Sequence, residues 1–478
     1  MIGSQDYDSE LLHIAQYAKD YTIVSDEAYK MAHWCLWDAL ACGLRALQHR
    51  DCTRLLGPLY GEGRCMLGAR VPGTSFCLPP PQAAFNIGVM NRWLDFNDTW
   101  LAKEWGHPSD NLGAILACAD YLSQQALQAG KPPLTMRHVF DAMIRAYEIQ
   151  GMMACGNAFN EKGLDHVILV KLASTAATMF LLQGTEAQYL AALSQVFVDG
   201  QALRTYRHWP NTGSRKSWAA GDATSRGFSL AWLSYLGEPG YPTALSAPKW
   251  GFYDVSFRGE RFVMPEFGSH VIEHILFKAA FPAEFHGQTA VEAALTLHPK
   301  IKDHLNKITS IQLETQAAGM RIIHKTGPLK NEADRDHCLE YMVACALLFG
   351  RLDEHSYSDE VAADPRIDQL RCLMRTTEQP KFTADYYDVE KRAIPNRVTV
   401  TFADTSISEQ VDYPIGHLKR RAEVFPYLRE KITASISGHY VEKDAERLVA
   451  YLEAPERVMS LSVPDFVNLW LSSLNPAV

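Results

Sequence analysis

The segment Pro81-Gln-Ala-Ala-Phe-Asn-Ile-Gly-Val-Met-Asn-Arg-Trp-Leu94 decides the fold class of this chain. Its opening proline suits the first turn of a helix, and Ala84, Ile87 and Met90 recur on one face at helical spacing. A second apolar segment, residues 112–127, has the same periodicity. The pattern therefore predicts two helices joined by a loop, and a body built from paired helices.

The joining loop, Trp93-Leu-Asp-Phe-Asn-Asp-Thr-Trp-Leu-Ala-Lys-Glu-Trp-Gly-His-Pro-Ser-Asp-Asn111, holds four acids, a lysine, a histidine and three tryptophans. We expect His107 and Asp95 to lie at facing helix ends, and Ser109 or Asp110 to cap the second helix. A capped, hydrogen-bonded structural loop is the alternative interpretation. The concentration of acid–base groups favours a site that handles carboxylates.

Helical periodicity continues along most of the chain, where apolar residues recur every three or four positions. Further helices are predicted over residues 25–47, 135–150, 165–183, 186–203, 219–236 and, in one or more pieces, 418–474. Ser25 can cap the first of them. These apolar stripes indicate a helical core.

Strand signals are confined to a later part of the chain. Residues 307–315 alternate apolar and polar positions, as do residues 397–402, which pair with a second strand through Val411 in a predicted hairpin. Helices are expected over 288–297 and 336–348. The fold class predicted is therefore mainly α with an α+β part, namely a large all-helical domain and a smaller α/β domain.

This pattern divides the chain into three segments. Residues 1–269 form the first part of the helical domain, residues 270–414 form the α/β domain, and residues 415–478 return to the helical domain. A chain of 478 residues is expected to form two domains, because a single core of that size is uncommon.

Composition narrows the function. Hydrophobic content of 47% with 21% charged residues is typical of a soluble globular protein. No apolar run approaches the roughly 18 residues that span a bilayer, and the first residues lack the basic and apolar regions of a signal peptide, so we expect a cytoplasmic protein without a membrane partner. The net charge of -9 argues against nucleic acid as a partner, and any anion site must be local.

Cysteine spacing bears on cofactors. The ten cysteines are scattered, without a C-x-x-C pair, so reduced thiols are expected and disulfides are not. Iron–sulfur ligation usually shows closely spaced cysteines, although a cluster held by distant cysteines stays an alternative. No cofactor and no metal ligand set is predicted. Absence of the phosphate-loop, zincin and nucleophile-elbow motifs disfavours those chemistries as well.

A second cluster of polar residues, residues 203–222, is strongly basic on an acidic chain. Its basic side chains are Arg204, Arg207, His208, Arg215 and Lys216. Arginine binds carboxylates through two parallel hydrogen bonds, so the segment suits recognition of a polycarboxylate. A solvated basic face is the alternative.

Two more basic positions lie near the expected domain boundary and two in a later turn. Lys278 and His286 occur in an apolar setting, where desolvation lowers the pKa of a lysine, although snorkelling to solvent is the commoner fate. His417 and Lys419 lie where the predicted hairpin returns to helix. Lys278 is a candidate catalytic residue, and His286, His417 and Lys419 are candidate binding residues.

Together these residues resemble the MmgE/PrpD family over essentially the whole chain. Family members share a D-F-x-D-T segment followed by His-Pro, here Asp95–Thr99 and His107-Pro108. They also share a lysine before a Gly-x-Ala helix, here Lys216, and a lysine before an aromatic-Pro pair, here Lys278. The blocks at residues 104–111, 203–208 and 333–338 are similar to the PrpD dehydratases in particular.

The resemblance implies an architecture and an activity. It implies a helical domain from both chain ends, an α/β lid domain, an active site in the cleft between them and a homodimer. The implied reaction is dehydration of 2-methylcitrate to 2-methyl-cis-aconitate, and of citrate to cis-aconitate, in the methylcitrate cycle of propionate breakdown. It would proceed by acid–base chemistry on a small tricarboxylate, without an iron–sulfur cluster.

The resemblance also assigns roles. His107 would be the lead acid–base group, oriented by Asp95 and assisted by Thr99, while Lys216 and Lys278 would stabilise an enolate-like intermediate or carry the second proton. The remaining candidates would bind substrate carboxylates, namely Arg204, Arg207, His208, Arg215, His286, His417 and Lys419. Two alternatives stay open, which are another enzyme of the family (a cis-aconitate decarboxylase or dicarboxylate epimerase) and a non-catalytic tricarboxylate-binding protein.

Overall fold

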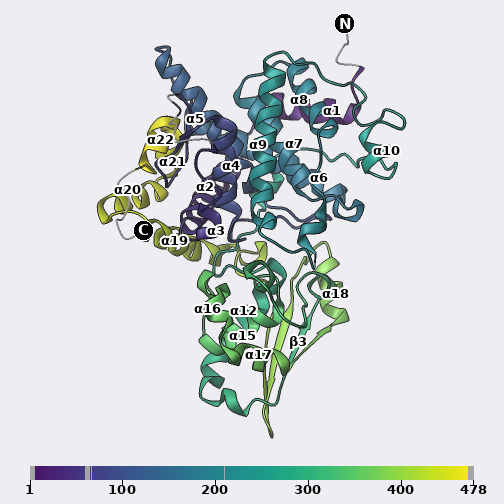
Figure 1. Cartoon of the computed structure of the whole chain (residues 1–478), viewed down its shortest axis with the longest axis vertical. Coiled ribbons are helices and arrows are strands. Elements are labelled where there is room, and N and C mark those ends of the chain that lie inside the picture. Colours follow the sequence, from purple (N-terminus) through teal and green to yellow (C-terminus); the bar gives the residue numbers. More distant parts are fainter. Residues whose placement is uncertain (1–5, 60–64, 66, 209, 472–478) are drawn as a thin grey trace. The chain divides into compact units, whose positions relative to one another are not determined.

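The computed structural model describes residues 6–59, 65, 67–208 and 210–471, and is mainly helical with a smaller mixed α and β part, as predicted (Figure 1). The first five residues, which contribute to the signal-peptide argument, lie outside this range. The chain divides into two compact units. We call residues 1–208, 217–276 and 429–478 the helical unit, and residues 209–216 and 277–428 the mixed unit.

Helices form most of the helical unit. They are α1 (Ser9–Asp20), α2 (Asp26–Ala46), α4 (Pro80–Arg92), α5 (Leu112–Gln128), α6 (Met136–Gly156), α7 (Val167–Leu181), α8 (Glu186–Val198), α9 (Arg215–Tyr235, of which residues 215 and 216 belong to the mixed unit), α20 (Glu442–Leu452), α21 (Pro455–Ser460) and α22 (Val463–Leu469). Short helices α3 (Arg50–Thr53), α10 (Phe252–Ser256) and α11 (His270–Glu273) connect them. Helix α19 (Arg421–Ser437) runs from the mixed unit into the helical unit.

Local sequence explains two features of this unit. The hydroxyl of Ser25 accepts a hydrogen bond from the amide of Ala28 at 3.1 Å, which confirms the predicted cap of α2. Nearly every residue of α7 is buried, because this helix is apolar on all sides and lies in the core. The unit also contains a short antiparallel pair that the pattern did not indicate, β1 (Ala69–Arg70) with β2 (Cys77–Leu78).

Glycines hold α4, α5 and α9 together around the polar loop. A Cβ atom added at Gly88 of α4 would lie 2.7 Å from the Cα of Gly221 in α9. A Cβ at Gly221 would in turn lie 2.7 Å from the carbonyl oxygen of Phe85. This approach fixes the helix that precedes residues 93–111, so the loop begins from a rigid support.

The mixed unit contains a four-stranded sheet in the order β4 (Met374–Glu378), β3 (Ser310–Thr315), β5 (Asn396–Thr401), β6 (Ser406–Val411). Strands β3 and β4 are parallel, and the other neighbours are antiparallel. The predicted hairpin is confirmed as β5 and β6. The helices of this unit are α12 (Gln288–Ile301), α13 (Ala317–Ile322), α14 (Glu332–Arg335), α15 (Leu339–Phe349), α16 (Asp359–Ala362), α17 (Pro365–Cys372) and α18 (Pro380–Tyr387).

Alternation along the strands gives this sheet one buried face. In β3, Ile311 and Leu313 are buried, and they pair in register with Val400 and Val398 of β5. These four side chains join one core with apolar residues of α12 and α15, two helices that lie together in Figure 1. The strand period of two therefore sets which face the helices cover.

No helix in the described residues has the length and apolar character needed to cross a membrane.

Candidate active site

The loop after α4 places Asp95 in a fixed position. Asp95 has φ of +50°, a left-handed conformation that aspartate adopts more readily than most residues, and its amide donates to the carbonyl of Arg92 at 3.2 Å. The guanidinium of Arg92 donates to the Asp95 carboxylate at 2.5 Å, and both side chains are buried. The Asp95 carboxylate is thus held by Arg92, the last residue of α4.

His107 faces this carboxylate. Its Nε2 lies 3.6 Å from Asp95 Oδ1, and its Nδ1 lies 2.6 Å from the carbonyl oxygen of Asp98. A carbonyl can only accept, so Nδ1 carries the proton and donates. In the neutral imidazole the lone pair is therefore on Nε2, the atom nearest Asp95. The structure brings together these two predicted catalytic residues.

The side chain of Asp98 braces the backbone that orients His107. Asp98 accepts hydrogen bonds from the hydroxyls of Tyr147 at 2.6 Å and Ser109 at 2.7 Å. Burial raises the pKa of Asp98 to about 6, although the bonds from Tyr147 and Ser109 act in the opposite direction. Because both partners belong to packed elements, the carbonyl that holds His107 is fixed.

The predicted cap of α5 is wrong. Asn111 is the residue that precedes this helix, and its side chain makes no cap bond. The Ser109 hydroxyl instead donates to Asp98, and the Asp110 carboxylate accepts from the side-chain amide of Asn97 at 3.2 Å. The amide of Ala114 in the first turn donates to the hydroxyl of Thr224 in α9.

Thr99, the third predicted catalytic residue of the loop, is buried. Its hydroxyl donates to the carbonyl of Gly106 at 3.3 Å, and its amide donates to Leu276 at 2.9 Å. These bonds tie the two sides of the loop to each other and to residue 276. Thr99 therefore supports the position of the residue next to His107.

A second histidine, His166, lies beside His107. The two ring centroids are 6.1 Å apart, and His166 Nδ1 lies 3.4 Å from Asp165 Oδ1. Burial lowers the pKa of His166 to about 3, against the opposing charge of Asp165. His166 is thus neutral near pH 7. Sequence reasoning had treated this position as part of a core helix.

Arg207 and Arg204 face carboxylates of their own unit. Arg207 forms a two-point ion pair with the buried Asp165, through Nε and, at 3.1 Å, through Nη2. Burial would raise the pKa of Asp165, but Arg207, His166 and Arg204 hold it well below its usual range. Arg204 lies 3.5 Å from Glu104 and 4.0 Å from Asp165, which are longer contacts. Of the two predicted carboxylate clamps, Arg207 is the more firmly paired.

Glu104 adds a buried acid to this group. It accepts from the amide of Asn160 at 2.6 Å, and burial raises its pKa to about 7 despite the nearby Arg204. Glu104, Gln150 and His166 line a narrow hollow next to the loop. Glu104 Oε1, Gln150 Nε2 and His166 Nε2 are buried without a hydrogen-bond partner among the described residues. Such groups are expected to meet a ligand or water.

Both predicted lysines, Lys216 and Lys278, lie in the mixed unit. We call these two residues and their neighbours the lysine cluster, whose other members are Asp336, His337, Glu284 and His286. The ammonium of Lys216 donates to both oxygens of Asp336, at 2.8 and 2.7 Å, and lies 3.1 Å from His337 Nδ1. Lys216 is only 2% exposed, so the carboxylate balances a buried charge. Asp336 and His337 are residues that sequence reasoning did not assign.

Glu284 connects the rest of the lysine cluster. It accepts from His286 Nδ1 at 2.8 Å and from the His286 amide at 2.8 Å. Burial alone would raise the pKa of Glu284, but His286, His337 and Lys278 together hold it below its ordinary value. Lys278 is therefore close enough to Glu284 to act on its ionisation.

Four predicted binding residues remain, namely His208, Arg215, His417 and Lys419. His208 is exposed in the helical unit, whereas Arg215 opens α9 and belongs to the mixed unit. His417 donates from Nε2 to the carbonyl of Arg392 at 3.0 Å and accepts at Nδ1 from the amide of Lys419 at 3.1 Å. Burial lowers the pKa of His417 to about 4. His417 thus caps a turn, and the exposed Lys419 follows it.

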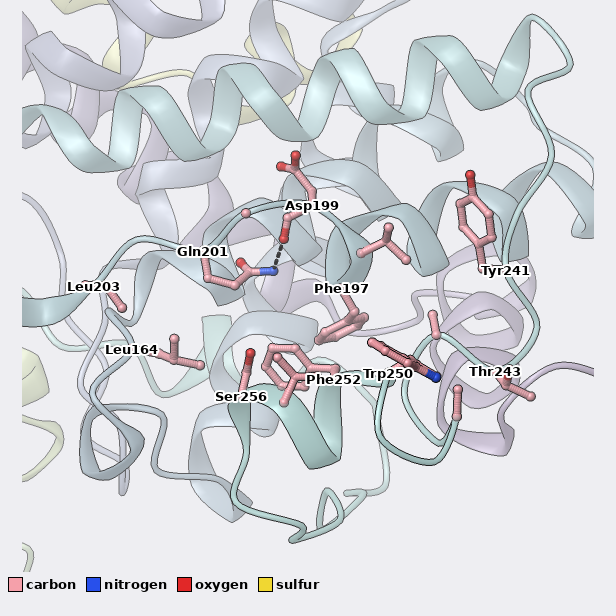
Figure 2. A pocket seen from close by; sticks show the side chains of 15 residues that line it. Leu164, Phe197, Asp199, Gln201, Leu203, Tyr241, Thr243, Trp250, Phe252 and Ser256 are labelled. Carbon is pink, nitrogen blue, oxygen red and sulfur yellow. Dashed lines mark hydrogen bonds between the residues drawn. The ribbon is translucent and has the colours of Figure 1, made fainter.

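A larger cavity, of about 480 Å³, lies elsewhere in the helical unit (Figure 2). Phe197, Trp250 and Phe252 contribute its aromatic lining, and the Gln201 amide donates to the Asp199 carbonyl at 2.8 Å. The Asp199 carboxylate pairs with Lys171 and Arg226. This lining includes none of the predicted site residues, so we place the candidate acid–base chemistry at His107.

Among the described residues, no set of three or more His, Cys, Asp or Glu side chains is arranged to hold a metal ion. The ten cysteines are free thiols, and most are buried.

Comparison with known proteins identifies the family of this chain. Residues 12–264 match the MmgE/PrpD N-terminal domain, and residues 281–454 match the MmgE/PrpD C-terminal domain. The chain is 54% identical to a 2-methylcitrate dehydratase of Salmonella typhimurium and 53% identical to one of Escherichia coli, in both cases over 98% of each chain. It is 47% identical to a mitochondrial 2-methylcitrate dehydratase of Yarrowia lipolytica, over 97% of this chain and 90% of the relative. With both halves matched and relatives of this identity along its whole length, the chain belongs to the MmgE/PrpD family.

Proposed function

We propose that this protein is a hydro-lyase that removes water from 2-methylcitrate to give 2-methyl-cis-aconitate, and from citrate to give cis-aconitate, in the methylcitrate cycle. The observation that carries the proposal is the oriented His107 imidazole, with Nδ1 bonded to a backbone carbonyl and Nε2 facing Asp95. The high identity to 2-methylcitrate dehydratases supports the choice of substrate.

The reaction needs a group that moves a proton. A hydrogen must leave a carbon beside a carboxylate while hydroxide leaves the neighbouring carbon. His107 Nε2 can take a proton because its lone pair is fixed by the bond at Nδ1, and the imidazolium that forms is stabilised by Asp95 at 3.6 Å. Arg92 donates to Asp95 and holds it in place. We assign His107 as the acid–base group and Asp95 as its orienting partner.

The substrate carries three carboxylates, which need cations or hydrogen-bond donors. Near His107, buried Arg204 Nη1 and Gln150 Nε2 lack hydrogen-bond partners among the described residues. Arg204 also has longer contacts to its acids than Arg207 has. We therefore assign carboxylate binding first to Arg204 and Gln150, with Arg207 fixing the local charge through Asp165.

The lysines supply positive charge that can stabilise the intermediate. Removal of the proton leaves negative charge on the activating carboxylate, and a preorganised ammonium stabilises that charge. Lys216 is held by Asp336, and Lys278 lies within range of Glu284. We assign both lysines to this role, and the chemistry as written uses no cofactor.

The direct test follows purified, chelator-treated protein with 2-methylcitrate and with citrate by NMR, while any evolved gas is collected. The proposal predicts methyl-aconitate or cis-aconitate with no carbon dioxide. Release of carbon dioxide would favour a decarboxylase, and inversion without loss of water would favour an epimerase. Saturable binding with no chemistry would favour a binding protein, and activity only after iron is restored would overturn the cofactor-free mechanism.

We also infer a cytoplasmic homodimer, in keeping with the resemblance to the PrpD dehydratases. Beside the cavity of Figure 2, Trp250 is 84% exposed, and Leu203 and Val255 are exposed as well. Exposed apolar groups of this kind mark association surfaces. Sedimentation of the wild type and of Trp250→Asp would test this, since the proposal predicts a dimer that the substitution weakens.

A further inference from the structure

The three-residue link between α14 and α15, Asp336-His337-Cys338, is firmly anchored in the mixed unit. Just before it, Arg335 donates to the carbonyl of Tyr357 at 2.6 Å and pairs with Asp359 at 2.6 Å. Just after it, the amide of Leu339 donates to the carbonyl of Ile323 at 2.8 Å. Because both flanks are fixed, the positions of the Asp336 and His337 side chains are determined by the fold.

These side chains form a tight triangle with Lys216, which lies 120 residues earlier in the chain. Lys216 Nζ is 2.8 Å from Asp336 Oδ1 and 3.1 Å from His337 Nδ1, and Nδ1 is 2.8 Å from the same Oδ1. All three sides of the triangle are within hydrogen-bond distance. The side chains of Asp336 and His337 are 14% and 21% exposed, against 2% for Lys216.

More than one arrangement of protons fits the distances in this triangle. If Lys216 is an ammonium that donates to His337, then Nδ1 is unprotonated and its lone pair faces a carboxylate oxygen at 2.8 Å. If Nδ1 carries a proton, it donates to Asp336, and Lys216 can accept from it only when the amine is neutral. With Nε2 protonated in both cases, an ammonium beside a neutral imidazole and a neutral amine beside an imidazolium carry the same total charge and differ by the location of one proton.

We propose that Asp336 and His337 are positioning residues that set the protonation of Lys216 by exchanging one proton with it. One N–H bond breaks at Lys216 Nζ and one forms at His337 Nδ1, the positive charge moves from the amine to the imidazole, and Asp336 stays negative throughout. Lys216 can then act as an ammonium or as a neutral amine within one buried site. The inference deepens the proposed function, because it depends on Lys216 serving the dehydration.

Other charged groups act on this triangle. Glu284 interacts electrostatically with His337, Lys278 and His286 from the segment before α12, and its negative charge favours a protonated His337. Lys278 favours the opposite state. On the triangle's own segment, Asp334 is held by Lys325 at 3.3 Å and Arg335 by Asp359, so the charges of both have local partners. Asp336 is the carboxylate in direct contact with both proton sites.

The first test observes protonation without relying on turnover. Full-length protein labelled with 13C at histidine Cε1 is titrated from pH 5 to 10, and the His337 signal is assigned by its loss in His337→Gln. In the wild type this signal should follow two coupled ionisations. In Lys216→Met the alkaline step should vanish and the His337 transition should move up by about one pH unit or more, because a competing positive charge is gone.

Matched variants separate coupling from general disruption. Lys216→Arg keeps a positive charge that cannot lose its proton, so it should also abolish the alkaline step. Asp336→Asn should lower the pH of the His337 transition. His324, whose imidazole pairs with Glu340 at 2.6 Å in the same unit, serves as an internal reference whose signal should be unchanged. A His337 transition at the same pH in the wild type and in a folded Lys216→Met protein, or an alkaline step that persists in a folded Lys216→Arg protein, would overturn the proposal.

The second test uses kinetics of the dehydration. His337→Gln can accept a hydrogen bond from Lys216 but cannot take its proton, so the Lys216 ionisation seen in kcat/KM should move to higher pH by about one unit or more. His324→Gln should leave the profile unchanged. A uniform loss at every pH would mean a structural role and would contradict the inference. If the wild type does not dehydrate 2-methylcitrate, the proposed function fails, whereas the NMR titration still decides whether the proton is shared.

Discussion

The two candidate clusters orient their central nitrogen atoms by different means. In the helical unit, His107 Nδ1 is held by the uncharged backbone carbonyl of Asp98 at 2.6 Å, while the Asp95 carboxylate lies 3.6 Å from Nε2. In the mixed unit, Lys216 is held by a carboxylate at 2.7 Å and an imidazole at 3.1 Å. A carbonyl fixes geometry without a charge of its own, whereas a carboxylate and an imidazole also act on the charge of the amine that they hold. The comparison therefore assigns proton transfer with the substrate to His107 and control of charge to the lysine cluster.

The largest effect is expected from breaking the first cluster at His107. His107→Gln removes the acid–base atom and should lower kcat by about a hundredfold to ten-thousandfold, as loss of such a group typically does. His439→Gln is the matched control, because its buried imidazole also contacts a backbone carbonyl, that of Gly73 at 2.9 Å. Steady-state kinetics with 2-methylcitrate should show the loss in His107→Gln alone.

Arg207 and Arg204 are expected to differ in their effects on stability and on substrate binding. Arg207→Ala leaves the buried Asp165 without its two-point partner and should lower the free energy of unfolding by about 3–5 kcal/mol. Arg204→Ala removes longer contacts and should raise KM more than it lowers stability. Chemical denaturation and steady-state kinetics of both variants separate these effects. Equal stability losses in the two variants would contradict the assignment.

Glu104 tests how burial affects charge in the helical unit. Its pKa is raised from 4.5 to about 7 in the folded state, so its contribution to stability is fully present below pH 4.5 and is lost as the pH rises to 7. Over this pH window the free energy of unfolding of the wild type should therefore fall by up to about 3 kcal/mol, and Glu104→Gln should remove that fall. The check is the difference in unfolding free energy between the two proteins from pH 4 to 8. A constant difference over that range would refute the expected burial effect.

The smallest effect is expected at Tyr147, which acts on His107 only through Asp98. Tyr147→Phe removes the bond to Asp98, whose carbonyl orients the imidazole, and should cost about 1 kcal/mol of stability with a several-fold loss of kcat. Tyr440→Phe removes a buried hydroxyl bonded to the Trp470 carbonyl at 2.7 Å and controls for loss of any such bond. A fall in kcat as large as that of His107→Gln would mean that Tyr147 acts in the chemistry itself.

Local sequence signals predicted the elements that depend on local physics. The Ser25 cap and the β5–β6 hairpin follow from residues a few positions apart, and the structure contains both. Strand β4 could not be predicted, because Met374-Arg-Thr-Thr-Glu378 has no apolar alternation and forms only by pairing with β3. The capping prediction for α5 was wrong because Ser109 and Asp110 bond to residues of the loop instead.

The candidate site divides in the same way. The facing of His107 and Asp95 was predictable, since both lie in one loop between two recognisable helices. His166 and Asp336 were not, because their contacts join segments far apart in the chain. An Asp-His pair at the start of an otherwise apolar helix, as at residues 165–166, is a signal that could have drawn attention to His166.

One measurement tests the central claim most directly. The turnover of 2-methylcitrate is followed by NMR for the wild type, His107→Gln and His439→Gln at equal protein concentration, after each variant is shown to be folded. The account predicts methyl-aconitate from the wild type and the His439 variant, and at most about a hundredth of that rate from the His107 variant. Comparable rates in all three proteins would show that His107 is not the acid–base group and would contradict the account.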